Sequence, residues 1–269
     1  MTDQVNIIEA TELQARLPEP NLLLVQVTSA DVYASAHLPG AVLVTPGELV
    51  CGIPPATGRL PEASQLVELF SRLGYHPNLD IVVYDDEGGG WAGRFAWTLD
   101  VIGHRRWTYM NGGMHAWAQA DGEFEQTINT PAPTEVTLEI DLAPIAEIED
   151  VLEAIEDSTQ AVWDVRSAEE YRGQRQAAAR VGHIPGAINW DWMHLKNPSD
   201  AMRLNPDIAA TLAELDLADK KIITHCQTHH RSGLSYMVGR LLGLDIRAYH
   251  GSWSEWGNRD DTPIELPQE

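Results

Sequence analysis

Short runs of apolar residues alternate along this chain with longer segments in which apolar residues recur every three or four positions. The apolar runs predict buried strands, at 22–27, 81–84, 107–110, 161–165, 222–225 and 246–249. The periodic segments predict amphipathic helices, at 61–73, 93–102, 206–215 and 232–242. Strands alternating with helices in such short units indicate a mainly parallel sheet covered on both faces, which is an α/β fold.

The second half of the chain resembles the first in four places, and the four occur in the same order. The matched segments are 24–33 with 162–171, 37–42 with 183–188, 81–85 with 222–226, and 109–117 with 249–256. An internal duplication explains this pattern. We therefore expect two α/β domains, each a mainly parallel sheet flanked by helices.

The domain boundaries follow from the same comparison. Pro131 and Pro133 break both helix and strand, so we predict a linker at 129–141. The first domain is then expected at 1–128 and the second at 142–269.

The charge of the chain limits its partners. Lys and Arg number 18 against 40 Asp and Glu, a formal charge of -22. That field repels nucleic acid and anionic membranes, so neither is expected as a partner. No signal peptide and no membrane-spanning run are seen in the sequence. An anionic substrate would need a local positive site.

The chain has two cysteines, Cys51 and Cys226, too few for a disulfide framework. We expect a reducing, cytoplasmic setting in which a thiol stays free. Cys51 has no base nearby in sequence and is expected to be structural. Histidines beside Cys226 suggest zinc, but a structural zinc needs four ligands and there is no second nearby cysteine. Neither a metal nor another cofactor is expected.

The chemistry concentrates in residues 224–233, Thr-His-Cys-Gln-Thr-His-His-Arg-Ser-Gly. A strand is expected to end at Cys226 and a helix to begin near Ser232, and ligands bind at such carboxyl ends. Backbone N–H groups of a tight loop there, with the helix N-terminus, favour an anion. Arg231 adds a fixed positive charge, and His229 and His230 add optional ones. Cys226 should therefore ionise readily, and its polar neighbours argue against burial.

The counterpart in the first half is Asp85-Asp86-Glu87-Gly88-Gly89-Gly90, which has a carboxylate in place of the thiol. Only one half is expected to be active, while the other is a scaffold or shapes the cleft. Gly88, Gly90 and Gly93 match a dinucleotide-binding fingerprint. The acidic residues beside them would repel a pyrophosphate, so we reject that interpretation.

Together these motifs resemble the rhodanese family, specifically its bacterial tandem-domain thiosulfate sulfurtransferases. The resemblance runs from 22 to 256 and is carried by 164–167, 170–171, 182–187, the Cys226 loop and 251–257. It implies two rhodanese-like domains, the second one catalytic. It also implies a ping-pong cycle in which the cysteine takes sulfur from an anionic donor such as thiosulfate. The sulfur then passes to cyanide, a thiol or a protein acceptor.

The resemblance also assigns roles to residues. Cys226 would carry the sulfur, and Arg231 and Arg166 would contact the anionic donor. Asp164 and Ser232 would support the geometry. The remaining predicted substrate-binding positions are Gln227, Thr228, His229, His230 and Trp192. The loop sequence Gln-Thr-His-His replaces the residues found in other branches of the family, so the physiological donor stays open, 3-mercaptopyruvate included.

Three other functions compete with catalytic sulfur transfer from thiosulfate. A persulfide carrier that delivers sulfur would use the same chemistry. A cysteine phosphatase would use the same thiolate, but its loop has one residue more than the four between Cys226 and Arg231. A redox-sensing or binding module of the same fold commonly loses the cysteine, and this chain keeps it.

Overall fold

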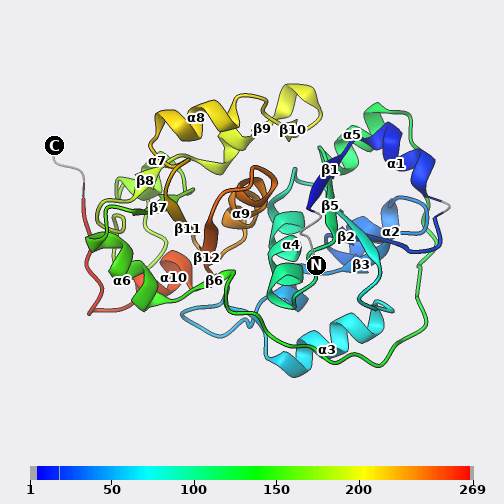
Figure 1. Ribbon diagram of the computed structural model, residues 1–269, viewed down its shortest axis with the longest axis horizontal. Helices are drawn as coiled ribbons and strands as arrows, with labels where there is room; N and C mark the ends of the chain where they lie inside the picture. The colour runs from blue at the N-terminus through cyan, green and yellow to red at the C-terminus, as the bar shows by residue number, and fades with distance from the viewer. Residues whose placement is uncertain (1–4, 18, 267–269) are drawn as a thin grey trace.

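The computed structural model describes residues 5–17 and 19–266 and contains two five-stranded parallel sheets, one from each half of the chain (Figure 1). The first sheet has the order β1-β5-β4-β2-β3, formed by Asn6–Ile8, Trp107–Met110, Asp80–Asp85, Leu22–Val27 and Val42–Val44. The second has the order β6-β12-β11-β7-β8, formed by Ile145–Ala146, Ile246–Tyr249, Lys221–His225, Gln160–Asp164 and Ile188–Asn189. The two orders correspond strand for strand, so the predicted duplicated α/β fold is confirmed.

Helices pack on both faces of each sheet, as the apolar strands require. In the first half these are α1 (Ala10–Arg16), α2 (Ala30–Ser35), α3 (Ala63–Arg72), α4 (Gly90–Val101) and α5 (Gly113–Gln119). In the second half they are α6 (Ile148–Glu156), α7 (Ala168–Tyr171), α8 (Ile208–Glu214), α9 (Arg231–Leu241) and α10 (Ser252–Trp256). The central strands β2 and β4 are buried from their second residue onward.

The predicted elements differ from these mainly at their ends. Helix α4 begins three residues before the expected position, because Gly89, with φ 105°, makes the turn from which it starts. The edge strands β1, β3, β6 and β8 were not expected, since two or three residues do not form a visible apolar run.

Two histidines occupy equivalent places in the halves. His37 stacks on Tyr33 with ring centroids 3.9 Å apart, and His183 stacks on Tyr171 at 3.6 Å. The Nδ1 atom of each ring bonds the backbone carbonyl of its stacking partner, at 2.7 and 2.9 Å. The repeated geometry agrees with a structural role for both histidines.

The halves meet where α4 and α9 lie side by side between the two sheets (Figure 1). The helices approach so closely that a Cβ atom added to Gly93 would lie 2.3 Å from the carbonyl oxygen of Gly233. Asp100 joins the same helices, because its carboxylate accepts bonds from Tyr236 at 2.8 Å and Arg240 at 2.7 Å. Each of these helices directly follows the loop at the end of its central strand, so their contact brings the two loops together.

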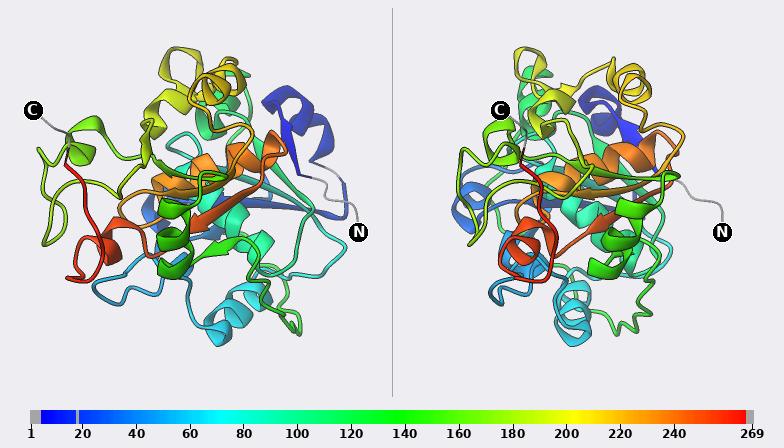
Figure 2. Two further views of the ribbon diagram at one scale, coloured as in Figure 1. Left: turned by 60° about the vertical axis from the view of Figure 1, so that its left-hand side comes forward. Right: turned by 90° about the vertical axis from the view of Figure 1, so that its left-hand side faces the viewer.

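The second half also reaches across to the first through an insertion. It contains the 3-10 helices η2 (Trp192–Leu195) and η3 (Pro198–Asp200) and the antiparallel pair β9 (Lys196–Asn197) and β10 (Arg203–Leu204). Leu204 N–H donates to Asn111 of the first half at 2.9 Å. Figure 2 shows this yellow segment beside α5. None of the described helices has the length and apolar character needed to traverse a lipid bilayer.

The helix crossing generates a prediction about stability. Gly93→Ala should lower the free energy of unfolding by about 1–3 kcal/mol, because the added methyl group forces α4 and α9 apart. This should happen although alanine favours a helix by about 1 kcal/mol over glycine. Urea denaturation measures the change. Gly47→Ala, where an added Cβ meets nothing within 4 Å, is the matched control. Equal stability of the two variants would contradict the proposed constraint.

Candidate active site

Cys226 directly follows β11, a central strand of the second sheet, and the loop 227–230 leads from it into α9. The residue is 1% exposed, so the expectation that its polar neighbours would keep it from burial is wrong. The reason is tertiary. The start of α10 packs under the loop, and the first domain packs against its outer side.

The start of α10 clamps the loop through Ser252. Its hydroxyl oxygen accepts from the N–H of Cys226 at 3.3 Å and from that of His229 at 3.1 Å. Trp253 N–H also donates to the Cys226 carbonyl at 2.9 Å. Ser252 has φ 53° and corresponds to Gly113 of the first half, with φ 54°. Sequence analysis assigned it no role, although a serine in the place of that glycine was a visible signal.

The sulfur of Cys226 lies among groups that favour its ionised form. The Ser232 hydroxyl donates to Sγ at 3.5 Å, and the Ser232 N–H also bonds it. Burial by itself raises the pKa of the Cys226 thiol, but Arg231, Ser232 and His230 together bring the pKa below its ordinary value. The predicted reactive thiolate therefore has a physical basis even without exposure to solvent.

Arg231 is held by a carboxylate that sequence analysis did not assign to the site. Its Nη1 and Nη2 atoms bond the two oxygens of Glu170 at 2.6 and 2.9 Å. Although burial would raise it, the pKa of Glu170 is lowered by Arg231. Glu170 stands at the third helical position of α7, where its carboxylate also accepts the N–H of Ser167, the residue that caps this helix. The bidentate pair fixes the guanidinium beside the loop.

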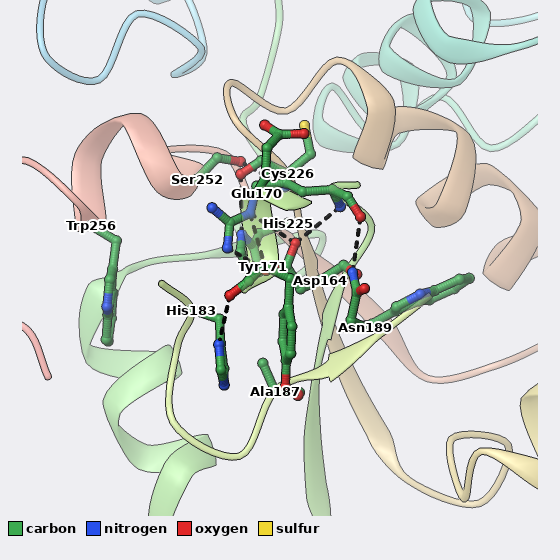
Figure 3. Close-up of polar contacts among 12 residues, drawn as sticks. Asp164, Glu170, Tyr171, His183, Ala187, Asn189, His225, Cys226, Ser252 and Trp256 are labelled. Carbon is green, nitrogen blue, oxygen red and sulfur yellow. Dashed lines mark hydrogen bonds and ion pairs between the residues drawn. The ribbon is translucent and has the colours of Figure 1, made fainter. Parts of the chain in front are cut away.

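A second buried ion pair lies beneath the loop. Arg166 Nε lies 3.0 Å from both oxygens of Asp164, and its Nη2 also donates to the Gly182 carbonyl at 2.9 Å. Arg166 is 1% exposed, although we expected it near the donor. Beside it, burial lowers the pKa of His225 to about 4. Figure 3 shows Asp164 and His225, whose Nε2 lies 3.6 Å from the Asp164 carboxylate, and Cys226, which directly follows His225.

The first domain packs against the back of the loop at His229. The Trp97 ring meets the His229 ring edge-on at 4.6 Å, and Arg94 Nη1 lies 3.5 Å from the His229 carbonyl oxygen. Arg94 is fully buried, and burial lowers its pKa to about 9. A Cβ on Gly58 would lie 2.0 Å from the Thr228 carbonyl oxygen, so that backbone also touches the loop.

His229 corrects a second expectation. Its ring is fully buried, its Nδ1 lies 2.8 Å from the Ser232 hydroxyl, and burial lowers its pKa well below the usual value for histidine. His229 is therefore neutral and does not supply the optional positive charge that the sequence suggested. The side-chain amide of Gln227 donates to the Ala177 carbonyl at 2.8 Å, on the segment before His183.

His230 and Trp192 lie on the side of the loop that faces the first domain. The two rings are 5.5 Å apart, and Trp91 of α4 stacks on His230 at 4.3 Å. The Nε2 atom of His230 bonds the Glu87 carboxylate. Lys196 Nζ lies 3.6 Å from the centre of the Trp192 ring. The structure thus brings the predicted residues of 226–232 and Trp192 together with first-domain residues that the sequence could not place.

The equivalent loop of the first domain is wrapped around its own carboxylate. Asp85 Oδ1 accepts from the N–H groups of Glu87, Gly88 and Gly89 at 3.2, 2.9 and 2.8 Å, and Oδ2 accepts from Ala92 at 3.0 Å. Burial and the charge of Glu87 raise the pKa of Asp85, and the N–H groups of Ala92, Gly89 and Glu87 oppose that rise. The loop at this place in the fold is therefore an anion-binding nest.

The loop after Cys226 has the same length before its helix but no internal carboxylate. In the part of the chain that the structure describes, the N–H groups of residues 227, 228, 230 and 231 have no hydrogen-bond acceptor. Cys51, the other thiol, is free and half-buried, and its Sγ contacts the Ala56 carbonyl oxygen at 3.4 Å. No group of three or more potential metal-ligating side chains occurs among the described residues.

The chain is similar to known proteins over nearly its whole length. A family model described as the rhodanese-like domain matches residues 9–120 and 147–259. A thiosulfate sulfurtransferase of Azotobacter vinelandii is 49% identical over 262 residues, which cover 97% of each chain. One of Pseudomonas aeruginosa is 46% identical with the same coverage. The 3-mercaptopyruvate sulfurtransferase of Escherichia coli is more distant, at 27% identity over 88% of this chain and 85% of its own.

Solved structures support the fold. The anaerobic ergothioneine biosynthesis enzyme of Chlorobium limicola superposes with a TM-score of 0.86, covering 98% of this chain and 71% of that one. Its identity to this chain is 20%, so the likeness concerns the architecture alone.

The electrostatics of the loop predict a shifted alkylation profile. Because Arg231 lowers the pKa of Cys226, removing its charge should move the midpoint of iodoacetamide alkylation to higher pH. Arg231→Ala alone would leave Glu170 buried without a partner, so the informative variant is Arg231→Met with Glu170→Gln. Glu170→Gln alone is the control, and a Cys51→Ala background leaves one thiol to follow. An unchanged midpoint in the double variant would disprove the assigned effect of Arg231.

Proposed function

The chain belongs to the rhodanese-like family, and we propose that it is a sulfurtransferase that moves sulfane sulfur from thiosulfate to cyanide or a thiol through a persulfide on Cys226. The proposal draws on the relatives named thiosulfate sulfurtransferase, which match the chain over nearly its whole length. A persulfide on Cys226 also requires groups in this structure that can stabilise the negative charge of its outer sulfur.

The observation that carries the proposal is the correspondence between the anion-binding nest after Asp85 and the loop of equal length after Cys226. In the first domain four N–H groups bind the carboxylate of Asp85. In the second domain Cys226 stands in its place with a shorter side chain. A sulfur atom added to Cys226 lengthens the side chain by one atom and carries the negative charge outward. The unoccupied N–H groups of the loop are then available to stabilise that charge.

The proposed cycle has two steps. The Cys226 thiolate attacks the outer sulfur of thiosulfate, the sulfur–sulfur bond of the donor breaks, and sulfite leaves with the electron pair. In the second step an acceptor attacks the outer sulfur of the persulfide, and the bonding electrons return to Cys226 as a thiolate. With cyanide the product is thiocyanate. No net oxidation occurs, because the sulfane sulfur changes carrier only.

The residues of the site take the following proposed roles. Arg231, held by Glu170, balances the charge of the thiolate and of the donor. Ser232 donates to the sulfur. We expected Arg166 to contact the sulfur donor. It is instead proposed to support the loop from below, because its charge is paired with that of Asp164.

The remaining predicted positions differ in what they offer a donor. The loop amides of Gln227 and Thr228 are proposed to bind the persulfide, and His229 is proposed to orient Ser232. Trp192 is proposed to line the approach to the loop, beside His230.

The organisation of the enzyme is proposed to follow the duplication. Residues 1–128 form the domain without a catalytic cysteine, 129–141 the linker and 142–269 the catalytic domain. A reducing, cytoplasmic setting suits a catalytic thiol that must stay unpaired, and both cysteines are free in the structure. A role as a persulfide carrier to a protein acceptor would use the same first step.

The persulfide itself is directly testable. Incubation with thiosulfate should increase the intact mass by one sulfur atom, and cyanide should remove it. Cys226→Ser should gain nothing, because a hydroxyl cannot form a persulfide, whereas Cys51→Ser should load normally. The measurement is intact-protein mass spectrometry. Failure of the wild-type protein to gain sulfur would refute the proposed function, and stoichiometric loading without turnover would favour sensing over catalysis.

The choice of donor is a separate prediction. We expect kcat/KM with thiosulfate to exceed that with 3-mercaptopyruvate, because the relatives named for thiosulfate are far more similar to this chain. Initial rates with each donor and cyanide as acceptor measure the ratio. Faster turnover of 3-mercaptopyruvate would reassign the donor and leave the persulfide step intact.

A further inference from the structure

The histidines around Cys226 differ sharply in exposure. His225 and His229 are fully buried, and burial lowers the pKa of both. His250 is 6% exposed, and burial lowers its pKa as well. The side chain of His230 is 23% exposed. Of these four histidines, His230 is therefore the one that an incoming molecule can reach.

His230 is also oriented by a carboxylate. Glu87 Oε1 bonds His230 Nε2 and accepts the Trp91 N–H at 3.1 Å. The Trp91 ring stacks on the imidazole with an angle of 21° between the planes. Lys196 Nζ donates to the Glu87 backbone carbonyl at 2.6 Å and so holds the acidic loop in place. An imidazole with one nitrogen bound to a fixed carboxylate is the usual arrangement of a general base.

The imidazole lies within electrostatic reach of the sulfur. His230 precedes the first residue of α9 in the loop that follows Cys226, and a positive charge gained by its ring would lower the pKa of Cys226. The Trp192 ring, at 5.5 Å, borders it on the other side. His230 is therefore a partly exposed residue of the loop that carries the sulfur, and aromatic rings from both domains border it.

We propose that His230, oriented by Glu87, is the general base that deprotonates a thiol acceptor during sulfur transfer. The inference rests on the proposed persulfide chemistry and names thiols as the acceptor class for which this site is built. The first domain then supplies a positioning residue, Glu87, to the catalytic domain. This gives a function to residues 85–90 of the first half, which the sequence predicted to be a scaffold or to shape the cleft.

The step balances as follows. The acceptor thiol gives its proton to the imidazole, and its sulfur attacks the outer sulfur of the persulfide. The bond between that sulfur and Cys226 Sγ breaks, and the electron pair returns to Cys226 as a thiolate. The acceptor leaves as a persulfide, and the proton on His230 passes to it or to water. An acceptor that arrives without a proton needs no base.

A single-turnover experiment separates the two classes of acceptor. The full-length protein is loaded with thiosulfate, freed of excess donor and discharged by one of three probes. At a mildly alkaline pH these are 2-mercaptoethanol, whose thiol is still largely protonated, and sulfite and 5-thio-2-nitrobenzoate, which are largely free of that proton. In His230→Asn the ratio of the 2-mercaptoethanol rate to either other rate should fall by about 100-fold or more. Glu87→Gln should lower the same ratio by a smaller factor.

His194→Asn is the matched control, because His194 is exposed and lies two residues from Trp192. Its ratio should equal that of the wild-type protein. Intact mass after loading shows whether each variant is folded and competent in the first step. Equal losses with all three probes, or no loss with any, would overturn the role of His230. Absence of sulfur on the wild-type protein would instead refute the proposed function.

Discussion

The constraint on which this structure depends is a thiol that is almost fully buried and yet has a lowered pKa. Cys226 is 1% exposed, and burial of an anion is costly unless donors and positive charges replace the lost water. Ser232, through its hydroxyl and its N–H group, and Arg231, through its charge, supply those replacements. Each of them must in turn be held in place. Glu170 holds Arg231, and Ser252 holds the loop from below. The residues that stabilise the Cys226 sulfur are therefore themselves held in place by other residues of the same domain.

The duplication explains why such a loop exists twice with different contents. Both copies place a tight turn at the end of a central strand, followed at once by a helix. In one copy the anion is built into the chain as Asp85, and in the other it would be carried as sulfur on Cys226. The carboxylate of Asp85 already occupies the N–H groups of its nest, so this loop has none of them left to bind a ligand. The same loop contacts His230 through Glu87.

Contact between the domains makes the site a property of the whole chain. Trp97, Arg94 and the backbone at Gly58 press on the loop from the first domain. The close crossing of α4 and α9 sets the distance from which they do so. Separating the helices would expose the sulfur and remove the neutral, dry surroundings of His229. Stability and sulfur chemistry are coupled for that reason.

The sequence by itself determined the inner strands of both sheets, part of the helices and the duplication, and it singled out Cys226 as the candidate for the chemistry. Apolar runs and repeated motifs are local, and the Cys226 loop lies in one continuous stretch with Arg231 and Ser232. Tertiary structure decided what those residues face. It buried Cys226, lowered the pKa of His229 by burial, and paired the charge of Arg166 with that of Asp164.

The structure also recruited partners far away in the chain. Glu170 and Ser252 come from other elements of the same domain, and Glu87 comes from the other domain, 143 residues before His230. No periodicity or spacing records such contacts, because burial and charge depend on the sum of everything packed around a group. A local sequence motif identifies the candidate reactive atom, while its ionisation and its access to other molecules depend on the tertiary structure.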